Sequence, residues 1–212
     1  MNTNELIAVL AAQASPVDVA GVQRRFYARL AAGVVLTVGA MLLLKGVPGL
    51  AATEWTAGWW LKLLFAAALA MAALVGLLRL SYPGMRLGGV PAAAALPLVL
   101  VWLVAGVMLL AAPAESRLPL LLGQTWRQCP FSIGLLSLPA LALSLWAARA
   151  LAPTRLVLAG AAAGLFSGAV AAFAYGLHCP EVQAPFVAVW YVLGILLPVG
   201  LGALLGPRLL RW

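Results

Sequence analysis

The sequence predicts an all-α integral membrane protein: a bundle of six transmembrane helices preceded by a short N-terminal cytoplasmic helix. Hydrophobic residues make up 65% of the 212 residues and charged residues only 8%, whereas about a quarter of the residues in a soluble protein are charged. The apolar residues lie in six long runs, and a helix needs about 20 such residues to cross a bilayer. We therefore expect a cytoplasmic partner-binding segment at residues 1–28 and a six-helix transmembrane domain at residues 29–212.

The first expected element is a short helix near the N-terminus, capped by Asn2 or Thr3 and with Glu5 in its first turn. Three apolar residues share one face of this helix: Leu6, Ile7 and Leu10. A short apolar helix beside a membrane either lies in the interface or enters the groove of a soluble partner. An interfacial helix carries Lys or Arg on its polar face, and residues 1–14 have none. The sequence therefore favours these three residues as contacts with a protein partner.

A second helix is expected to begin at Ser15. Serine caps this helix, Pro16 takes its first position, and Asp18 stands where a capping box places an acid. The helix then continues through Arg24 and Arg25 into the first span.

The six apolar runs define the expected spans, listed here in chain order: Leu30–Val47, Trp59–Leu78, Val90–Ala112, Phe131–Ala148, Leu156–Tyr175 and Phe186–Leu205. Pro97, Pro139 and Pro198 lie inside spans, where we expect kinks.

The distribution of basic residues predicts the orientation. Nine arginines lie in the N-terminal segment, in the second and fourth connections, and in the tail: Arg24, Arg25, Arg29, Arg79, Arg86, Arg149, Arg155, Arg208 and Arg211. Four basic residues lie at the opposite ends of the spans: Lys45, Lys62, Arg117 and Arg127. The positive-inside rule therefore puts both termini in the cytoplasm. Four tryptophans form an expected aromatic belt at the outer interface: Trp55, Trp59, Trp60 and Trp126. Because the basic residues are scattered singly, no nucleic-acid partner is expected.

This orientation puts both cysteines of the chain, Cys129 and Cys179, on the outer, oxidising side. Cys179 follows the only histidine, His178. Two thiols there can form a structural disulfide, which is the default interpretation, or a reversible disulfide that reports redox state. With His178 they can instead bind a thiophilic metal ion such as copper or zinc. The residues alone leave these three alternatives open, and no cofactor is certain.

The sequence lacks the residues that several classes of function require. The spans carry no ionisable side chain in their interior apart from Lys62, which stands near a helix end and can snorkel outward. Ion-coupled transporters need such groups at mid-depth. A P-loop, a serine triad, a metal-hydrolase pair and a second axial histidine for haem are all missing. Quinone-linked thiol oxidoreductases carry a Cys-x-x-Cys pair, and here the cysteines are far apart. We therefore expect a protein that is not an enzyme.

The fifth span repeats a small residue at every fourth position: Gly160, Gly164, Gly168, Ala172 and Gly176. Small residues in this register let another helix approach closely. Packing within the six-helix bundle is the favoured interpretation, and a homodimer through this face is the alternative.

Several motifs together resemble the NrsF-like anti-sigma factors, a family of six-span inner-membrane proteins formerly described as a domain of unknown function. The resemblance covers nearly the whole chain. It rests on four motifs, which are Glu5-Leu6-Ile7 with Ser15-Pro16-Val17, Trp126-Arg127-Gln128-Cys129-Pro130-Phe131, His178-Cys179-Pro180, and Gly206-Pro207-Arg208-Leu209-Leu210-Arg211-Trp212.

The resemblance implies a bacterial inner-membrane protein whose cytoplasmic leader holds an extracytoplasmic-function sigma factor. It also implies that Cys129 and Cys179 receive a periplasmic oxidative or metal signal. The leader contacts at Leu6, Ile7 and Leu10 are our own choice within that implied role. The alternative function is a membrane metal-handling or thiol-redox protein, in which the leader is only an anchor.

Overall fold

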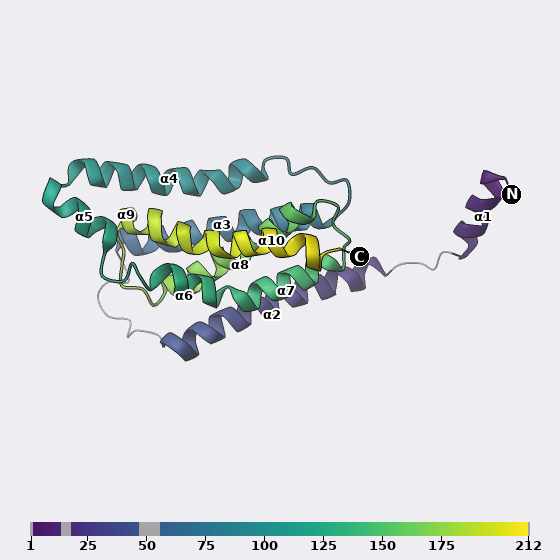
Figure 1. Cartoon of the computed structure of the whole chain (residues 1–212), viewed down its shortest axis with the longest axis horizontal. Coiled ribbons are helices and arrows are strands. Elements are labelled where there is room, and N and C mark those ends of the chain that lie inside the picture. The colour runs from purple at the N-terminus through teal and green to yellow at the C-terminus, as the bar shows by residue number, and fades with distance from the viewer. Residues whose placement is uncertain (1, 14–17, 47–55, 212) are drawn as a thin grey trace.

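The computed structural model describes residues 2–13, 18–46 and 56–211, and within these ranges all regular structure is helical. Six segments are long and apolar enough to cross a membrane, which confirms the predicted all-α class and the predicted number of membrane-length apolar helices. The long helices run alongside one another in a bundle, and the N-terminal helix lies apart from it (Figure 1). The elements are α1 (Thr3–Gln13), α2 (Val19–Lys45), α3 (Ala57–Ser81), α4 (Val90–Ala111), α5 (Ala114–Leu122), α6 (Cys129–Leu136), α7 (Leu138–Arg149), α8 (Leu156–Gly176), α9 (Ala184–Phe186), the π-helix η1 (Val187–Tyr191) and α10 (Val192–Leu209).

Helix α2 begins before Leu30 and runs through Arg24 and Arg25 into the first span, as predicted. Asp18 caps this helix by accepting a hydrogen bond of 2.9 Å from the backbone N–H of Gly21, so it is the N-cap residue and not the capping-box acid. Phe26 is only 2% exposed and packs into the bundle core. The predicted cap at Ser15, with Pro16, lies outside the described residues, as does Trp55 of the aromatic belt.

Two spans are interrupted. The fourth span divides into α6 and α7 at Ser137, just before Pro139, which lacks an N–H for the helical ladder. The sixth span contains α9, the π-helix η1 and α10, and Pro198 lies inside α10. A π-helical turn widens the helix locally and re-aims its side chains. In this span the turn brings the ring of Tyr191 within 6.2 Å of the ring of Tyr175 on α8.

Helix α5 was not predicted. It lies in the connection that the sequence presents as an outer loop between Pro113 and Pro130. Glu115 stands in its first turn, and Gly123 ends it with a φ of +56°. The helix is too short to span a membrane. The indole N–H of Trp190 donates a hydrogen bond of 2.9 Å to the Leu121 carbonyl, which ties the end of α5 to the sixth span.

Helix α8 forms the centre of the bundle, packing against α10 and α3 most extensively. A Cβ atom at Gly160 would overlap the carbonyl oxygen of Gly202, and one at Gly164 would overlap that of Pro198. The small residues of α8 therefore allow α10 to approach closely, which confirms the predicted packing role. Because α10 covers this face, the homodimer alternative loses the surface on which it was based.

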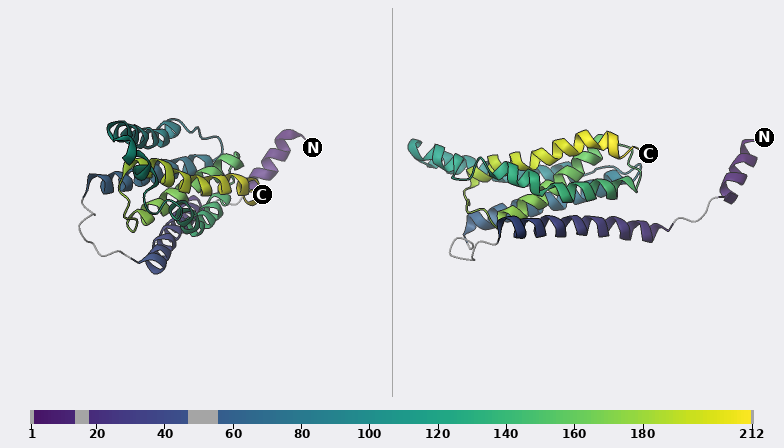
Figure 2. Two further views of the ribbon diagram at one scale, coloured as in Figure 1. Left: turned by 60° about the vertical axis from the view of Figure 1, so that its left-hand side comes forward. Right: turned by 60° about the horizontal axis from the view of Figure 1, so that its bottom comes forward.

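The bundle has two chemically different ends. The arginine end comprises the start of α2, the 82–89 and 150–155 connections and residues 208–211. The cysteine end comprises α5, the 123–128 turn and the 177–183 segment. Figures 1 and 2 show these groups at opposite ends, with α1 beyond the arginine end. The nine arginines assigned to one side by the sequence thus lie at one end of the bundle or close to it.

Candidate thiol site at the cysteine end

The two cysteines lie in one buried cluster. Cys129 is the first residue of α6 and is 0% exposed, and Cys179 follows α8 and is 3% exposed. Both belong to the same hydrophobic core cluster, and both carry free thiols. The Cys179 backbone N–H donates 2.9 Å to the Tyr175 carbonyl, so this residue extends the last turn of α8. The structure therefore joins two positions that are fifty residues apart in sequence.

Lys62 is the unexpected member of this site. Its side chain is 0% exposed, and its ammonium group donates hydrogen bonds to the carbonyl oxygens of Cys179 at 2.5 Å and of Glu181 at 3.1 Å. The prediction that Lys62 snorkels outward is therefore wrong. The 177–183 segment folds over the end of α3 and supplies backbone acceptors, so the charge is satisfied inside the protein. A buried cation needs such partners because desolvation is costly.

Glu181 connects the same segment to the turn after α5. Its carboxylate accepts a hydrogen bond of 2.7 Å from the backbone N–H of Gln124. A Cβ atom at Gly123 would lie 2.8 Å from the Glu181 carboxyl carbon, so glycine permits this close approach. The hydroxyl of Thr125 lies 3.8 Å from the sulfur of Cys179. Lys62 and the 123–128 turn therefore both contact Cys179, and Glu181 links the Cys179 segment to that turn.

Aromatic and polar groups complete the surroundings of the thiols. Tyr175 and Tyr191 are both buried and belong to the same core cluster as the two cysteines. Within the described residues, the Tyr191 hydroxyl and the His178 Nδ1 are buried without a hydrogen-bond partner. Buried polar atoms without partners are uncommon in folded proteins. The site therefore holds two unpaired polar atoms beside the thiols in an apolar core.

Comparison with known proteins places the chain in a family. Residues 10–212 match the model of the NrsF family, described as negative regulator of sigma F. The chain belongs to the NrsF family. It is 43% identical to a protein of Azospira oryzae named probable anti-sigma-F factor NrsF, and 40% identical to the anti-sigma-F factor NrsF of Caulobacter vibrioides. Both alignments cover all of this chain and all of the relative. No solved structure matches the chain.

The predicted metal ligands of this NrsF-family chain are Cys129, Cys179 and His178. Among the described residues, no group of three or more His, Cys, Asp or Glu side chains is placed to hold a metal ion. Cys129 and Cys179 share a cluster, while His178 turns its ring toward Tyr175, with the ring centres 6.2 Å apart. Binding of a copper or zinc ion by these three residues stays a prediction.

The predicted partner contacts of this NrsF-family chain lie on α1, beyond the arginine end of the bundle. Leu6, Ile7 and Leu10 are exposed by 40%, 59% and 59%. The Glu5 carboxylate accepts a hydrogen bond of 3.2 Å from the backbone N–H of Asn2, which is the acidic half of a capping box. The helix is therefore locally stabilised while its apolar residues remain uncovered. Their role in binding stays a prediction.

Sequence reasoning missed Lys62, Glu181 and Tyr191 as parts of the thiol site. The signal for Lys62 was present, because an ionisable residue inside a span is by default a candidate functional residue. Tyr191 carried no comparable signal, since its position depends on the π-helical turn.

Proposed function

We propose that this chain is a membrane anti-sigma factor that sequesters an extracytoplasmic-function sigma factor through its N-terminal segment. We further propose that it releases the sigma factor when the Cys129–Cys179 pair changes state. The observation that carries the proposal is the full-length similarity to two proteins named anti-sigma-F factor NrsF. The regulatory family membership is also consistent with a protein that has no enzymatic activity.

The exposed apolar residues of α1 support its role in binding. A free helix gains nothing by exposing Leu6, Ile7 and Leu10 to water, and burial of each leucine on a partner contributes about 1.5–3 kcal/mol. An apolar helix of this length fits the groove mode of recognition, in which anchor residues at i, i+1 and i+4 enter a hydrophobic groove. Sequestration follows if the helix occupies a surface that the sigma factor needs for polymerase.

The arrangement of charge supports a multi-pass orientation with both termini in the cytoplasm of the bacterial inner membrane. The segments that carry the nine arginines lie at the end from which α1 extends, and cytoplasmic connections are rich in Lys and Arg. This orientation puts the cysteine end in the periplasm, where thiols can be oxidised.

The contacts of the thiol pair support a switch rather than a separate activity. Formation of one S–S bond would remove two protons and two electrons from the thiols, which an external disulfide or similar oxidant would accept. The pair joins the start of α6 to the end of α8, and α8 packs against α3, α7 and α10. A new bond at this point changes how the central helices pack. A hundredfold loss of sigma affinity requires a coupling free energy of only about 2.7 kcal/mol.

Affinity purification of the detergent-solubilised chain tests the proposed function. A soluble sigma factor should co-purify with the unchanged chain and be lost from the Leu6→Asp/Leu10→Asp variant, with equal amounts of membrane protein recovered. Recovery of no sigma factor with the unchanged chain, together with thiol-dependent redox activity, would favour the alternative of a thiol-redox protein.

A further inference from the structure

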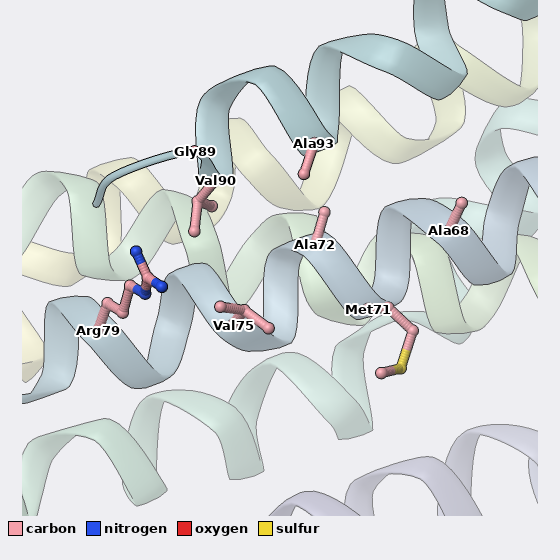
Figure 3. A pocket seen from close by; sticks show the side chains of 8 residues that line it. All are labelled: Ala68, Met71, Ala72, Val75, Arg79, Gly89, Val90 and Ala93. Atoms are coloured by element: carbon pink, nitrogen blue, oxygen red, sulfur yellow. The ribbon is translucent and has the colours of Figure 1, made fainter.

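An apolar groove runs between α3 and α4 toward the arginine end. It has a volume of 360 Å³, and its apolar lining comes from both helices: Ala68, Met71, Ala72, Val75, Val90 and Ala93. Helix α4 leaves most of its surface exposed and packs mainly against α3 and α9. Figure 3 shows Arg79 of α3 at one end of the groove, close to Gly89 and Val90 at the start of α4. The groove is therefore apolar along its length and cationic at one end.

Arg79 has hydrogen-bonding capacity left for a ligand. Its Nη1 atom donates to the carbonyl oxygens of Leu87 at 2.8 Å and Arg86 at 3.5 Å, which holds the 82–89 connection in place. Both bonds use Nη1, so within the described part of the chain Nε and Nη2 have no acceptor. Two neighbouring guanidinium N–H groups are the usual bidentate donors to a phosphate.

A second cavity adjoins the groove at Arg79. It has a volume of 340 Å³ and is also lined by Arg86, Arg155, Tyr82 and Thr154. Both Arg86 and Arg155 are exposed, and none of the residues that line this cavity is acidic. Three arginines thus line one cavity that has no carboxylate in its lining. Such a cavity favours an anion.

We infer that the groove and the cavity together bind one anionic phospholipid, with an acyl chain between α3 and α4 and the headgroup phosphate beside Arg79. Arg79 lies in the last turn of α3, which is the depth of the lipid headgroups for a spanning helix. Basic residues at this depth on the cytoplasmic side attract anionic lipids. A free phosphate would use only the cavity, and a zwitterionic lipid would leave the surplus positive charge unpaired.

Native mass spectrometry of the full chain in a non-denaturing detergent tests this inference. The probes are phosphatidylglycerol and phosphatidylcholine with identical acyl chains, and inorganic phosphate alone. We expect phosphatidylglycerol to be retained about tenfold more tightly than phosphatidylcholine, and inorganic phosphate not to compete at equal concentration. Equal retention of the two lipids, or competition by inorganic phosphate as strong as that by phosphatidylglycerol, would overturn the inference.

Matched variants separate the two halves of the site. Arg79→Gln should abolish the preference for phosphatidylglycerol, whereas Arg117→Gln at the cysteine end should preserve it. Because Arg79 also holds the 82–89 connection, the Arg86→Gln/Arg155→Gln variant provides a second test on exposed residues and should reduce the preference. Ala93→Phe should fill the groove and weaken retention of both lipids. Ala95→Phe, at an exposed position of α4 outside the groove, should have no effect. Unchanged preference in both arginine variants would contradict the assignment.

Discussion

The ammonium group of Lys62 on α3 donates a hydrogen bond of 2.5 Å to the backbone carbonyl of Cys179. The same group bonds the Glu181 carbonyl at 3.1 Å, so one buried cation holds the segment that carries a cysteine of the thiol pair. The position of Cys179 is therefore coupled to α3, which extends from the cysteine end to the arginine end.

Lys62→Met should loosen the Cys179 segment. Methionine keeps most of the side-chain volume but leaves a buried carbonyl at Cys179 and a partly buried one at Glu181 without their charged donor. The buried group alone costs about 1–3 kcal/mol. We expect alkylation of Cys179 by a maleimide to become at least several-fold faster. The rate can be measured by mass shift in a Cys129→Ser background. Lys45→Met, at the end of α2, is the control. An unchanged alkylation rate for Lys62→Met would show that Lys62 does not hold the Cys179 segment.

Gly202→Leu should destabilise the bundle, because its side chain would meet the backbone of Gly160 on α8. Overpacking of this kind costs roughly 1–3 kcal/mol. The midpoint of thermal unfolding in detergent should fall by several degrees. Gly200→Leu is a matched control two residues away, since nothing lies within 4 Å of a Cβ at Gly200. Equal midpoints for the two variants would contradict the close α8–α10 contact.

Leu6→Asp or Leu10→Asp should release the sigma factor while the chain still inserts into membranes. A charge placed in an apolar groove loses the leucine contribution and adds a desolvation penalty. The measurement is the dissociation constant of the sigma factor from the purified chain. Asn4→Asp and Ala12→Asp are the controls, because they add the same charge near each end of α1. Full binding by both leucine variants would show that α1 does not bind the sigma factor through Leu6 and Leu10.

A reporter that is active only in the periplasm should work when inserted between Pro113 and Ala114, before α5, and fail when fused after Trp212. An insertion in the 82–89 connection should also be inactive. The reverse pattern would place the cysteine pair in the reducing cytoplasm, where a disulfide switch has no basis.

The sequence predicted the six spans well because each is a long apolar run bounded by charges or turns. Val90 and Leu156 begin their helices where the pattern indicated. The small-residue face of α8 was also predictable, because a small residue recurs at every fourth position. Interruptions within spans were harder to predict from the sequence, because the π-helical turn that ends at Tyr191 depends on packing at the cysteine end.

The thiol site was predictable only in part. The pattern of charges put Cys129 and Cys179 at the same end, but it could not show that they share one core cluster. Lys62 was misinterpreted because snorkelling and internal pairing both suit a lysine near a helix end. The deciding factor is the path of the 177–183 segment, whose carbonyl groups turn toward α3, and no local sequence signal encodes that path.

The thiol pair should act as one unit. Cys129→Ser, Cys179→Ser and the double variant should abolish the response to oxidants equally, because a disulfide needs two sulfurs. His178→Ala should leave a disulfide response almost unchanged and strongly weaken a response to copper or zinc. Sigma-dependent transcription measured with a reporter gene distinguishes these outcomes. A double serine variant that inserts normally and still responds fully would make the cysteines structural only.

The most direct test of the central claim is the affinity of the co-purified sigma factor for the chain in lipid nanodiscs, measured with the thiol pair reduced and oxidised. We predict tight binding to one state and binding about a hundredfold weaker to the other. The difference should vanish in the Cys129→Ser/Cys179→Ser variant. Equal affinity of the unchanged chain in both redox states would contradict the claim that this pair controls release of the sigma factor.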